Sequence, residues 1–165
     1  MNNVPTIQRD RDGSSSIIQL VSFELDGEEY GVDVLSVREI IRLPSITKMP
    51  NTPDYVEGVI NLRGTVVPII SLRRRFGLTD SESSRCSRIL VMETTGGLNG
   101  FTVDAVAEVI RIAAGDVQPP PSITHGTAAQ DCISGVVRHG ERLLVTLDLN
   151  RLFSDEEQTL LRTVV

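Results

Sequence analysis

The sequence contains no tryptophan, and aromatic residues make up only 4% of its 165 residues. Hydrophobic residues nevertheless reach 40%, so the core must be built mainly from valine, isoleucine and leucine. Such a core suits strands better than long helices, because β-branched residues pack well on a pleated surface. The shortage of aromatics therefore predicts a mainly β protein, and the length fits one domain or two small lobes that share a core.

Cysteine is almost absent, and no hydrophobic run is long. Cys86 and Cys132 lie far apart and form no CxxC pattern, which argues against a disulfide framework and a zinc site. Free thiols suit a reducing cytoplasm. No apolar run approaches the ~20 residues that a membrane-spanning helix needs, and the polar N-terminus lacks the apolar segment of a signal peptide. We therefore expect a cytoplasmic protein with no metal and no other cofactor.

Positive charge is also scarce. The chain has 16 lysines and arginines against 22 aspartates and glutamates, which gives a formal net charge of −6 and a pI of about 4.9. An acidic surface repels phosphate backbones, so nucleic acid is not an expected partner. The one basic run, Arg73-Arg74-Arg75, is short, and we interpret it as the solvated face of a helix.

Motifs for catalysis are missing as well. His125 and His139 are the only histidines, and neither lies near an acid or cysteine in a recognisable triad, so we interpret both as loop or turn residues. Nucleotide binding has no support from a GxGxxG or GxxxxGK[ST] pattern. The glycine-rich segment 96–100 separates two expected strands and predicts a hairpin turn. We predict no catalytic residues.

The apolar pattern predicts short strands joined by tight turns. We expect strands over 17–25, 28–34, 46–49, 56–62, 65–70, 88–93, 100–106, 108–112, 133–138 and 142–147. Helical spacing from Val34 to Ile41 predicts one helical turn that continues into a strand. Residues 1–16 are expected to form a disordered arm, residues 113–130 a long connection, residues 17–161 one domain of two similar lobes, and residues 162–165 a tail.

Three polar residues are expected to cap helices. Ser71 precedes a short helix over 72–76, and Asp148 precedes another that ends at Phe153. Ser154 precedes a final helix, and Glu157 lies three residues later, which is the spacing of a capping box.

The chain also repeats itself. Residues 37–43 match residues 106–112, and the match extends back to Gly31 and Gly100. A second block matches Gly58 with Gly135 and Ser71 with Asp148 at a larger offset, which the longer connection at 113–130 absorbs. Each half then holds about five short strands, and five twisted strands can close into a small barrel that hides its edges. The duplication predicts two barrels that bury one continuous core.

Glu39 and Glu108 occupy equivalent positions in this repeat, and both are flanked by apolar residues. A carboxylate in such a place is costly to bury unless it is paired, and Arg63 and Arg42 are candidate partners for Glu39. The alternative is that both acids face water on the outer side of an alternating strand. The pattern leaves both interpretations open.

Three segments together resemble the CheW domain family. They are residues 29–40, which include Val37-Arg38-Glu39-Ile40; residues 51–64, which end in Asn61-Leu62-Arg63-Gly64; and residues 67–73, which begin Val67-Pro68-Ile69. The resemblance extends from about Ile17 to Leu161. It implies a mainly β fold of two Src-homology-3-like five-stranded β-barrels with short helices and a C-terminal helix.

The resemblance also implies a non-catalytic adaptor. Such adaptors couple the cytoplasmic hairpin tips of chemoreceptors, the methyl-accepting chemotaxis proteins, to the regulatory domain of a CheA-type histidine kinase. This protein would then be a monomer when free and would be recruited from the cytoplasm to membrane-associated receptor arrays. The family positions give receptor-binding residues Val34 and Val37 and, through the repeat, Val103 and Val106; kinase-binding residues Ile46, Met49 and Pro50; and an assembly salt bridge between Glu39 and Arg63.

Two other functions stay open at this point. One is an adaptor for a non-flagellar pathway, such as twitching motility or development. The other is a small-ligand sensor or enzyme in the cleft between the barrels, which would need clustered polar groups with perturbed pKa values. A cleft lined by valine, leucine and isoleucine favours the adaptor, whereas one that converges on His125, Asp131 and Asp148 favours the enzyme.

Overall fold

Residues 16–120 and 131–164 are described by the computed structural model of this protein. Residues 1–15 of the predicted arm and residues 121–130 of the predicted connection therefore lie outside the described residues. The strands are β1 (Ile17–Leu25), β2 (Glu28–Asp33), β3 (Val37–Arg42), β4 (Val56–Leu62), β5 (Thr65–Ser71), β6 (Arg88–Thr94), β7 (Gly97–Val103), β8 (Ala105–Ala113), β9 (Ile133–His139) and β10 (Arg142–Leu147). The helices are η1 (Val34–Ser36), α2 (Leu72–Arg75), η2 (Ala114–Asp116), η3 (Leu149–Arg151) and α4 (Asp155–Val164).

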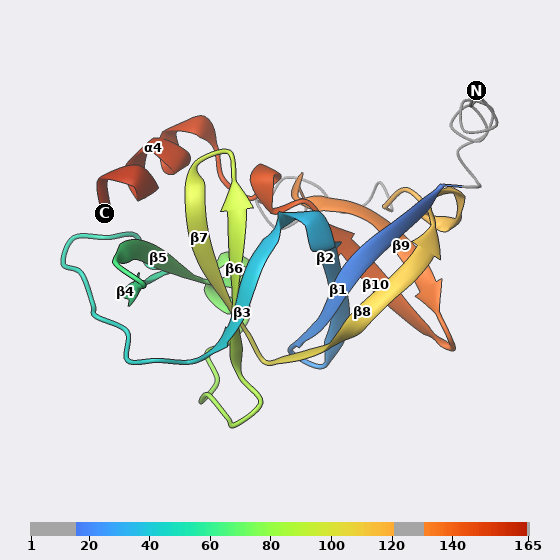
Figure 1. Cartoon of the computed structure of the whole chain (residues 1–165), viewed down its shortest axis with the longest axis horizontal. Coiled ribbons are helices and arrows are strands. Elements are labelled where there is room, and N and C mark those ends of the chain that lie inside the picture. The colour runs from blue at the N-terminus through green and yellow to red at the C-terminus, as the bar shows by residue number, and fades with distance from the viewer. Residues whose placement is uncertain (1–15, 121–130, 165) are drawn as a thin grey trace.

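The strands form two five-stranded sheets that lie side by side (Figure 1). One sheet has the order β3-β6-β7-β5-β4 and is called barrel 1. The other has the order β8-β1-β2-β10-β9 and is called barrel 2. The two orders are equivalent, because each strand of barrel 1 corresponds to the strand of barrel 2 that is five strands earlier or later in the chain; β3 corresponds to β8, for example, and β6 to β1. The mainly β fold with two similar lobes is confirmed.

Each barrel closes where the chain beyond one edge strand pairs with the other edge strand. In barrel 1, Thr47 and Val59 exchange backbone hydrogen bonds of 2.9 and 2.8 Å. In barrel 2, Gln118 and Val136 exchange two bonds of 2.8 Å. The predicted strand over 46–49 is thus a single bridge at Thr47.

The closing bridges explain two of the repeated glycines. A Cβ on Gly58 would lie 2.2 Å from the carbonyl oxygen of Thr47, and one on Gly135 would lie 2.8 Å from that of Gln118. Real Cβ atoms do not approach backbone this closely. Only glycine therefore allows each barrel to close at these two equivalent places.

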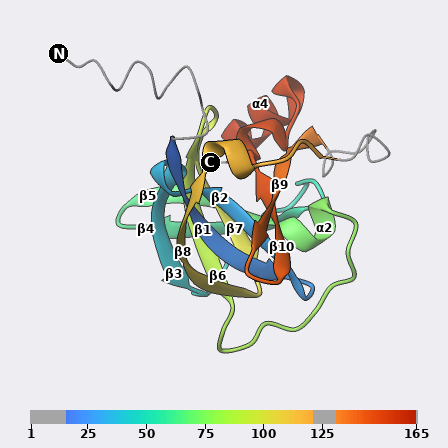
Figure 2. The same ribbon diagram turned by 90° about the vertical axis from the view of Figure 1, so that its right-hand side faces the viewer.

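The prediction that each half of the chain closes its own barrel is wrong. The β1–β2 hairpin pairs with β8 and β10, which lie in the second half of the chain. The β6–β7 hairpin pairs with β3 and β5, which lie in the first half. The chain crosses between the barrels at η1 and again at Asp104, so each barrel contains two strands of one repeat and three of the other. Figure 2, which looks onto barrel 2, shows β1 beside β8.

Several predicted boundaries also shift. The segment predicted as one strand over 100–106 is divided at Asp104, because β7 ends at Val103 and β8 begins at Ala105. The turn between β6 and β7 is Thr95-Gly96, and β7 already begins at Gly97. The C-terminal helix extends to Val164, so most of the predicted tail is helical.

The predicted caps are present at all three helices. The Ser71 hydroxyl accepts a hydrogen bond from the amide of Arg74, and the Asp148 carboxylate accepts one from Asn150. In the capping box, the Ser154 amide donates to Glu157 at 2.9 Å and the Glu157 amide donates to Ser154 at 3.1 Å. Local polar chemistry therefore fixes where these helices begin.

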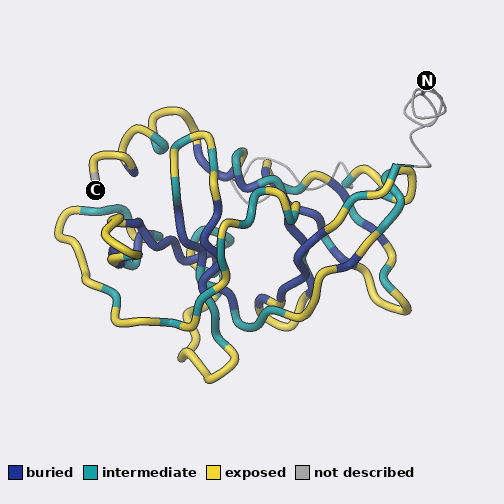
Figure 3. Tube along the Cα trace, viewed as in Figure 1, coloured by how far each residue is buried: buried dark blue, intermediate teal, exposed yellow. Residues whose placement is uncertain are grey.

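One core runs through both barrels, as the duplication predicted. Phe23 and Leu25 of barrel 2 pack in the same buried cluster as Leu90 and Phe101 of barrel 1. Each barrel adds a smaller aliphatic cluster of its own, such as that around Ile69 in barrel 1. Buried segments gather where the two barrels meet (Figure 3). Burial of this apolar surface between the barrels stabilises their association.

Candidate functional site

The Asn61-Leu62-Arg63-Gly64 motif forms the turn between β4 and β5. Arg63 has φ +53° and Gly64 has φ +90°, which is the pattern of a tight hairpin turn. The Asn61 side chain accepts a hydrogen bond of 2.7 Å from the Gly64 amide and so holds the turn. The motif is therefore a rigid hairpin that projects the Arg63 guanidinium from the edge of barrel 1.

Arg63 makes a two-pronged ion pair with Glu39. Its two terminal nitrogens each donate to one carboxylate oxygen at 2.6 Å. The hydrogen bond and the charge of Arg63 lower the pKa of Glu39, and Glu39 in turn raises the pKa of Arg63. The pair joins β3 to the β4–β5 turn, across the place where barrel 1 closes. The sequence pattern left open whether Glu39 is paired or faces water, and the structure shows that it is paired, with Arg63 rather than Arg42 as the partner.

The surroundings of the pair are solvent-exposed. The Arg63 side chain is 73% exposed and that of Glu39 is 25% exposed, so the pair contributes little to folding stability. Two aliphatic residues of barrel 1 are also exposed. Ile40 follows Glu39 on β3 and is 40% exposed, and Val66 lies on β5 and is 45% exposed. Adjacent residues of a strand point to opposite faces, so Ile40 projects away from Glu39. The surface of barrel 1 thus presents both a charge pair and exposed aliphatic side chains, which a protein partner can contact.

The equivalent pair in barrel 2 is weaker. Glu108 lies 3.4 Å from Nε2 of His139, again between β8 and the end of β9. The Glu108 side chain is 59% exposed, which agrees with the interpretation that this acid faces water. Of these two equivalent pairs, Glu39–Arg63 has bidentate geometry and Glu108–His139 does not.

The predicted kinase-binding segment belongs to the connection between β3 and β4. Ile46 is half-buried against the barrel 1 core, where it lies close to Gly58. Met49 is 37% exposed and Pro50 is exposed. Ile46 therefore anchors the segment, and Met49 and Pro50 are the residues that it presents to solvent.

The four predicted receptor-binding valines flank the two crossovers between the barrels. Val34, Val37 and Val106 are half-buried and pack against the shared core, with part of each side chain accessible. Val103 is a core residue with only 3% of its surface exposed. The repeat placed Val103 correctly at the second crossover, but burial removes it as a contact for a partner.

A groove lies where barrel 2 meets the end of β6, and we call it the inter-barrel groove. Its apolar lining consists of Ile18, Leu20, Val32, Met92, Ala114, Val117, Leu147 and Leu149. Its acids include Asp33 and Asp148, but both carboxylates cap helices by accepting hydrogen bonds from Leu35 and Asn150. Asp131 is not among its lining residues, and His125 lies outside the described residues. The groove thus combines the aliphatic lining that we associated with an adaptor with polar side chains such as Glu93, Thr94 and Asn150.

Leu35 stands at the rim of the inter-barrel groove. It lies in η1 between the lining residues Asp33 and Ser36, and it is 89% exposed. Asp33 accepts a hydrogen bond of 2.9 Å from the Leu35 amide, which fixes the turn. A leucine side chain that is almost entirely exposed to water is a candidate contact residue. Its position between Val34 and Ser36 in the sequence gave no signal of this exposure.

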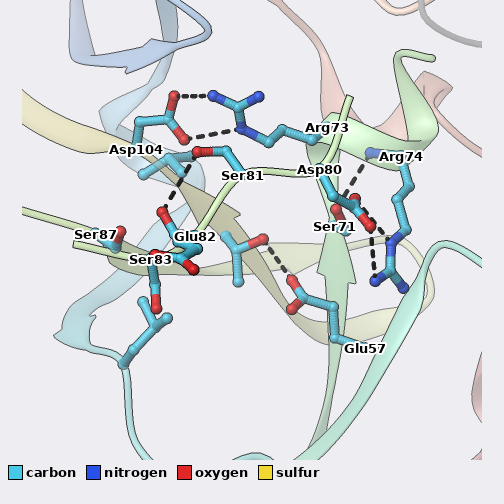
Figure 4. A pocket seen from close by; sticks show the side chains of 13 residues that line it. Glu57, Ser71, Arg73, Arg74, Asp80, Ser81, Glu82, Ser83, Ser87 and Asp104 are labelled. Carbon is cyan, nitrogen blue, oxygen red and sulfur yellow. Dashed lines mark hydrogen bonds and ion pairs between the residues drawn. The ribbon is translucent and has the colours of Figure 1, made fainter. Parts of the chain in front are cut away.

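The interpretation of Arg73-Arg74-Arg75 as a solvated helix face is wrong. The Arg73 and Arg75 side chains are only 16% and 12% exposed. Arg73 pairs with Asp104 and Arg74 with Asp80, and Figure 4 shows the two guanidiniums directed at these different acids. In the pocket of Figure 4, both arginines are therefore paired with acids, and Glu57 accepts a hydrogen bond from the Thr102 hydroxyl.

Arg75 attaches the C-terminal helix to barrel 1. Its guanidinium donates to both carboxylate oxygens of Glu157 at 2.9 and 2.6 Å and to the carbonyl of Leu152 at 2.9 Å. It also lies over the rings of Tyr55 and Phe153, at 4.6 and 5.0 Å from their centroids. The acid bound by Arg74 is six positions away in the sequence, that of Arg73 is 31 away and that of Arg75 is 82 away. Local periodicity gives no signal for pairs at such separations.

Within residues 16–120 and 131–164, no group of three or more His, Cys, Asp or Glu side chains is arranged to hold a metal ion. No helix in these ranges has the length and hydrophobicity needed to cross a membrane. Cys132 is fully buried, and burial raises the pKa of its thiol to about 12. Its thiolate is therefore not accessible for nucleophilic chemistry at neutral pH.

Comparison with known proteins agrees with this geometry. A profile of the CheW-like domain matches residues 19–157. The chain belongs to the CheW-like family. It is 38% identical over 143 residues to the chemotaxis protein CheW of Treponema pallidum, with 84% of each chain covered. It is 36% identical over 146 residues to CheW of Klebsiella aerogenes, with 88% of this chain and 87% of the relative covered.

A solved structure matches as well. The crystal structure of the scaffolding protein TtCheW from Thermoanaerobacter tengcongensis aligns with a TM-score of 0.78 and 37% sequence identity. The alignment covers 86% of this chain and 96% of that one. The CheW-like chain described here thus shares its fold with a scaffold protein, and its relatives are named for chemotaxis.

Proposed function

We propose that this CheW-like protein is a non-catalytic adaptor that couples chemoreceptor tips to a CheA-type histidine kinase in chemosensory arrays. The family membership and the scaffold relative support the general role. The observation that carries the proposal is the bidentate Glu39–Arg63 pair, which lies on the surface of barrel 1 with a largely exposed guanidinium. An adaptor of this kind transmits a state between partners and makes no product. The protein acts in the cytoplasm, where the receptor array recruits it.

The receptor side of the adaptor is the region between the barrels. A receptor tip is a helical hairpin, and a helix binds a partner through one apolar face. Val34, Val37 and Leu35 offer apolar surface at the first crossover, next to the aliphatic inter-barrel groove. Val34 and Val37 pack against the shared core, and the Asp33 cap holds the turn that carries Leu35. The surface is therefore formed before the receptor binds, which lowers the entropic cost of binding.

The kinase side is the surface of barrel 1 around Glu39 and Arg63. Met49 and Pro50 add exposed apolar area from the β3–β4 connection. A partner that covers this surface removes water from the Glu39–Arg63 pair, which strengthens its charge interaction. The contact is of moderate size, and many such contacts in an array together give stable assembly.

Co-sedimentation tests the proposal. Receptor signalling fragments, this protein and the kinase are mixed at micromolar concentration, and we expect the kinase to sediment with receptors only when the adaptor is present. Arg63→Ala should lower kinase recruitment by about tenfold and leave receptor binding unchanged. Arg42→Ala is the matched control, because Arg42 is exposed on the same barrel and is not the partner of Glu39.

Two outcomes count against the proposal. The absence of any ternary complex at micromolar concentration refutes the adaptor function. If Arg63→Ala unfolds at room temperature, the pair stabilises the fold, and its role in assembly loses its basis. Glu39→Gln, which keeps the shape of the side chain and removes its charge, serves as a second variant with the same expected effect on kinase recruitment.

A further inference from the structure

Arg73 connects three segments that belong to different parts of the molecule. Its Nε and Nη2 donate to the two carboxylate oxygens of Asp104 at 3.2 and 2.7 Å. Its Nη1 donates to the carbonyl of Thr79 at 2.7 Å and lies 3.4 Å from the Asp26 carboxylate. Arg73 is on α2 of barrel 1, Asp26 is in the β1–β2 turn of barrel 2, and Asp104 is where the chain crosses between the barrels.

The acids of this network also hold each other. The Asp26 amide donates to Asp104 at 2.8 Å, and the Asp104 amide donates to the carbonyl of Glu24 at 3.0 Å. Burial raises the pKa of Asp104, but the hydrogen bonds from Arg73 and from the Asp26 amide together lower it by more. The net shift of this pKa is therefore downward. Asp104 therefore stays charged at neutral pH, and the network connects barrel 1 to barrel 2 through charge-assisted bonds.

This network lies at one end of the interface between the barrels, and the inter-barrel groove lies at the other. Ile18 and Leu20, near the start of β1, line the groove, whereas Asp26 follows the end of the same strand. Along β6, Met92 lines the groove, whereas Arg88 at the other end pairs with Val103, the residue before Asp104. A bond at one end of such an interface limits how far the other end can open.

We propose that Arg73, with Asp104 and Asp26, clamps the two barrels in a fixed relative orientation and thereby sets the shape of the surface between them that partners bind. Arg73 is a positioning residue, because it acts through the orientation of the barrels. The effect on receptor binding rests on the proposed adaptor function, whereas the effect on barrel orientation does not. The clamp accounts for an arginine that is only 16% exposed and whose guanidinium is bound by groups from both barrels.

The neighbouring arginine provides a matched control. Arg74 is on the same helix turn and also pairs with an acid, but its contacts are Asp80 and the carbonyl of Asp54, both outside barrel 2. Arg73→Met and Arg74→Met each remove one charged group and keep an unbranched side chain. Only the first removes a bond between the barrels. Asp104→Asn weakens the clamp from the other side with a smaller change in shape.

The experiment measures the distance between spin labels on the two barrels of the full-length protein. Arg42→Cys on β3 and Arg138→Cys on β9 supply exposed label sites, with the exposed Cys86 replaced by serine. Cys132 can stay, because its buried thiol does not react at neutral pH. We expect Arg73→Met and Asp104→Asn to broaden or shift the distance distribution, and Arg74→Met to leave it as in the wild type.

Receptor-fragment binding is measured on the same variants without labels. We expect Arg73→Met to weaken binding about fivefold or more, and Arg74→Met to leave it unchanged. An unchanged distance distribution in Arg73→Met and Asp104→Asn overturns the clamp. A changed distribution with unchanged receptor binding overturns its influence on the binding surface. If the wild type binds no receptor fragment, the adaptor function fails, while the distance measurement still decides whether the clamp exists.

Discussion

Replacement of Gly58 by alanine tests how barrel 1 closes. Gly58 has φ +148°, and an added Cβ would lie 2.2 Å from the carbonyl oxygen of Thr47. That oxygen accepts the hydrogen bond from the Val59 amide, and the Thr47 amide donates the second bond of the bridge. The methyl group therefore cannot be accommodated unless the segment around Thr47 moves away and both bonds break.

The size of the effect follows from these contacts. Each lost backbone hydrogen bond costs about 1 kcal/mol. The backbone conformation, which residues other than glycine rarely adopt, adds about 1 kcal/mol. We therefore expect Gly58→Ala to lower the free energy of unfolding by about 3 kcal/mol. Gly27→Ala is the control, because Gly27 has φ +80° but no atom within 4 Å of the added Cβ. It should cost only the conformational part, about 1 kcal/mol.

Urea denaturation followed by circular dichroism measures both variants, and hydrogen exchange adds a local measurement. The Thr47 and Val59 amides should lose protection in Gly58→Ala, while amides in barrel 2 keep theirs. Equal loss of stability in Gly58→Ala and Gly27→Ala would refute the reasoning. So would unchanged protection at Thr47, since the bridge would then tolerate the methyl group.

Three further predictions concern the charges, the groove rim and the shared strands. Because the pKa of Asp104 is lower in the folded protein, its stabilising effect is lost as the pH falls below the ordinary aspartate value of 3.8. The free energy of unfolding, measured as a function of pH in this acid range, should therefore fall less steeply for Asp104→Asn than for the wild type. Leu35→Ser should change the free energy of unfolding by less than about 0.5 kcal/mol and should weaken receptor binding, and normal binding would remove Leu35 from the contact surface. Cleavage in the exposed segment 81–86 should leave two fragments that co-elute until denaturant is added, because each barrel contains strands from both; separately folded fragments would contradict the strand exchange.

Features that depend on neighbouring residues were predictable from the sequence. The strands follow β-branched runs, and Ser71, Asp148 and Ser154 cap helices because their acceptor groups lie next to free amides. The repeat indicated two similar lobes with one core. It did not indicate which hairpin joins which barrel, because alternation of apolar residues assigns faces to a strand but does not choose its neighbours.

The parts of the candidate site that were predictable are those that depend on short sequence motifs rather than on contacts that only the fold creates. The Glu39–Arg63 pair could be proposed because a carboxylate among apolar residues needs a cation and the turn motif supplies one. The roles of Arg73 and Arg75 depend on Asp104 and Glu157, which only the fold brings near. Val103 was assigned to a surface because the repeat equates it with Val34, and burial is a property of each site rather than of the repeat.

In the proposed adaptor, this difference between equivalent sites sets which crossover a partner can use. The repeat equates Leu35 with Asp104, the middle residues of the two crossovers. At the first crossover, Leu35 is 89% exposed beside an aliphatic groove. At the second, Asp104 is bound by Arg73 and by the Asp26 amide, so the barrels are joined there by polar contacts. A symmetric pair of crossovers would offer two equal surfaces. Divergence at this one pair of positions leaves the first crossover open to a partner and uses the second to hold the barrels together.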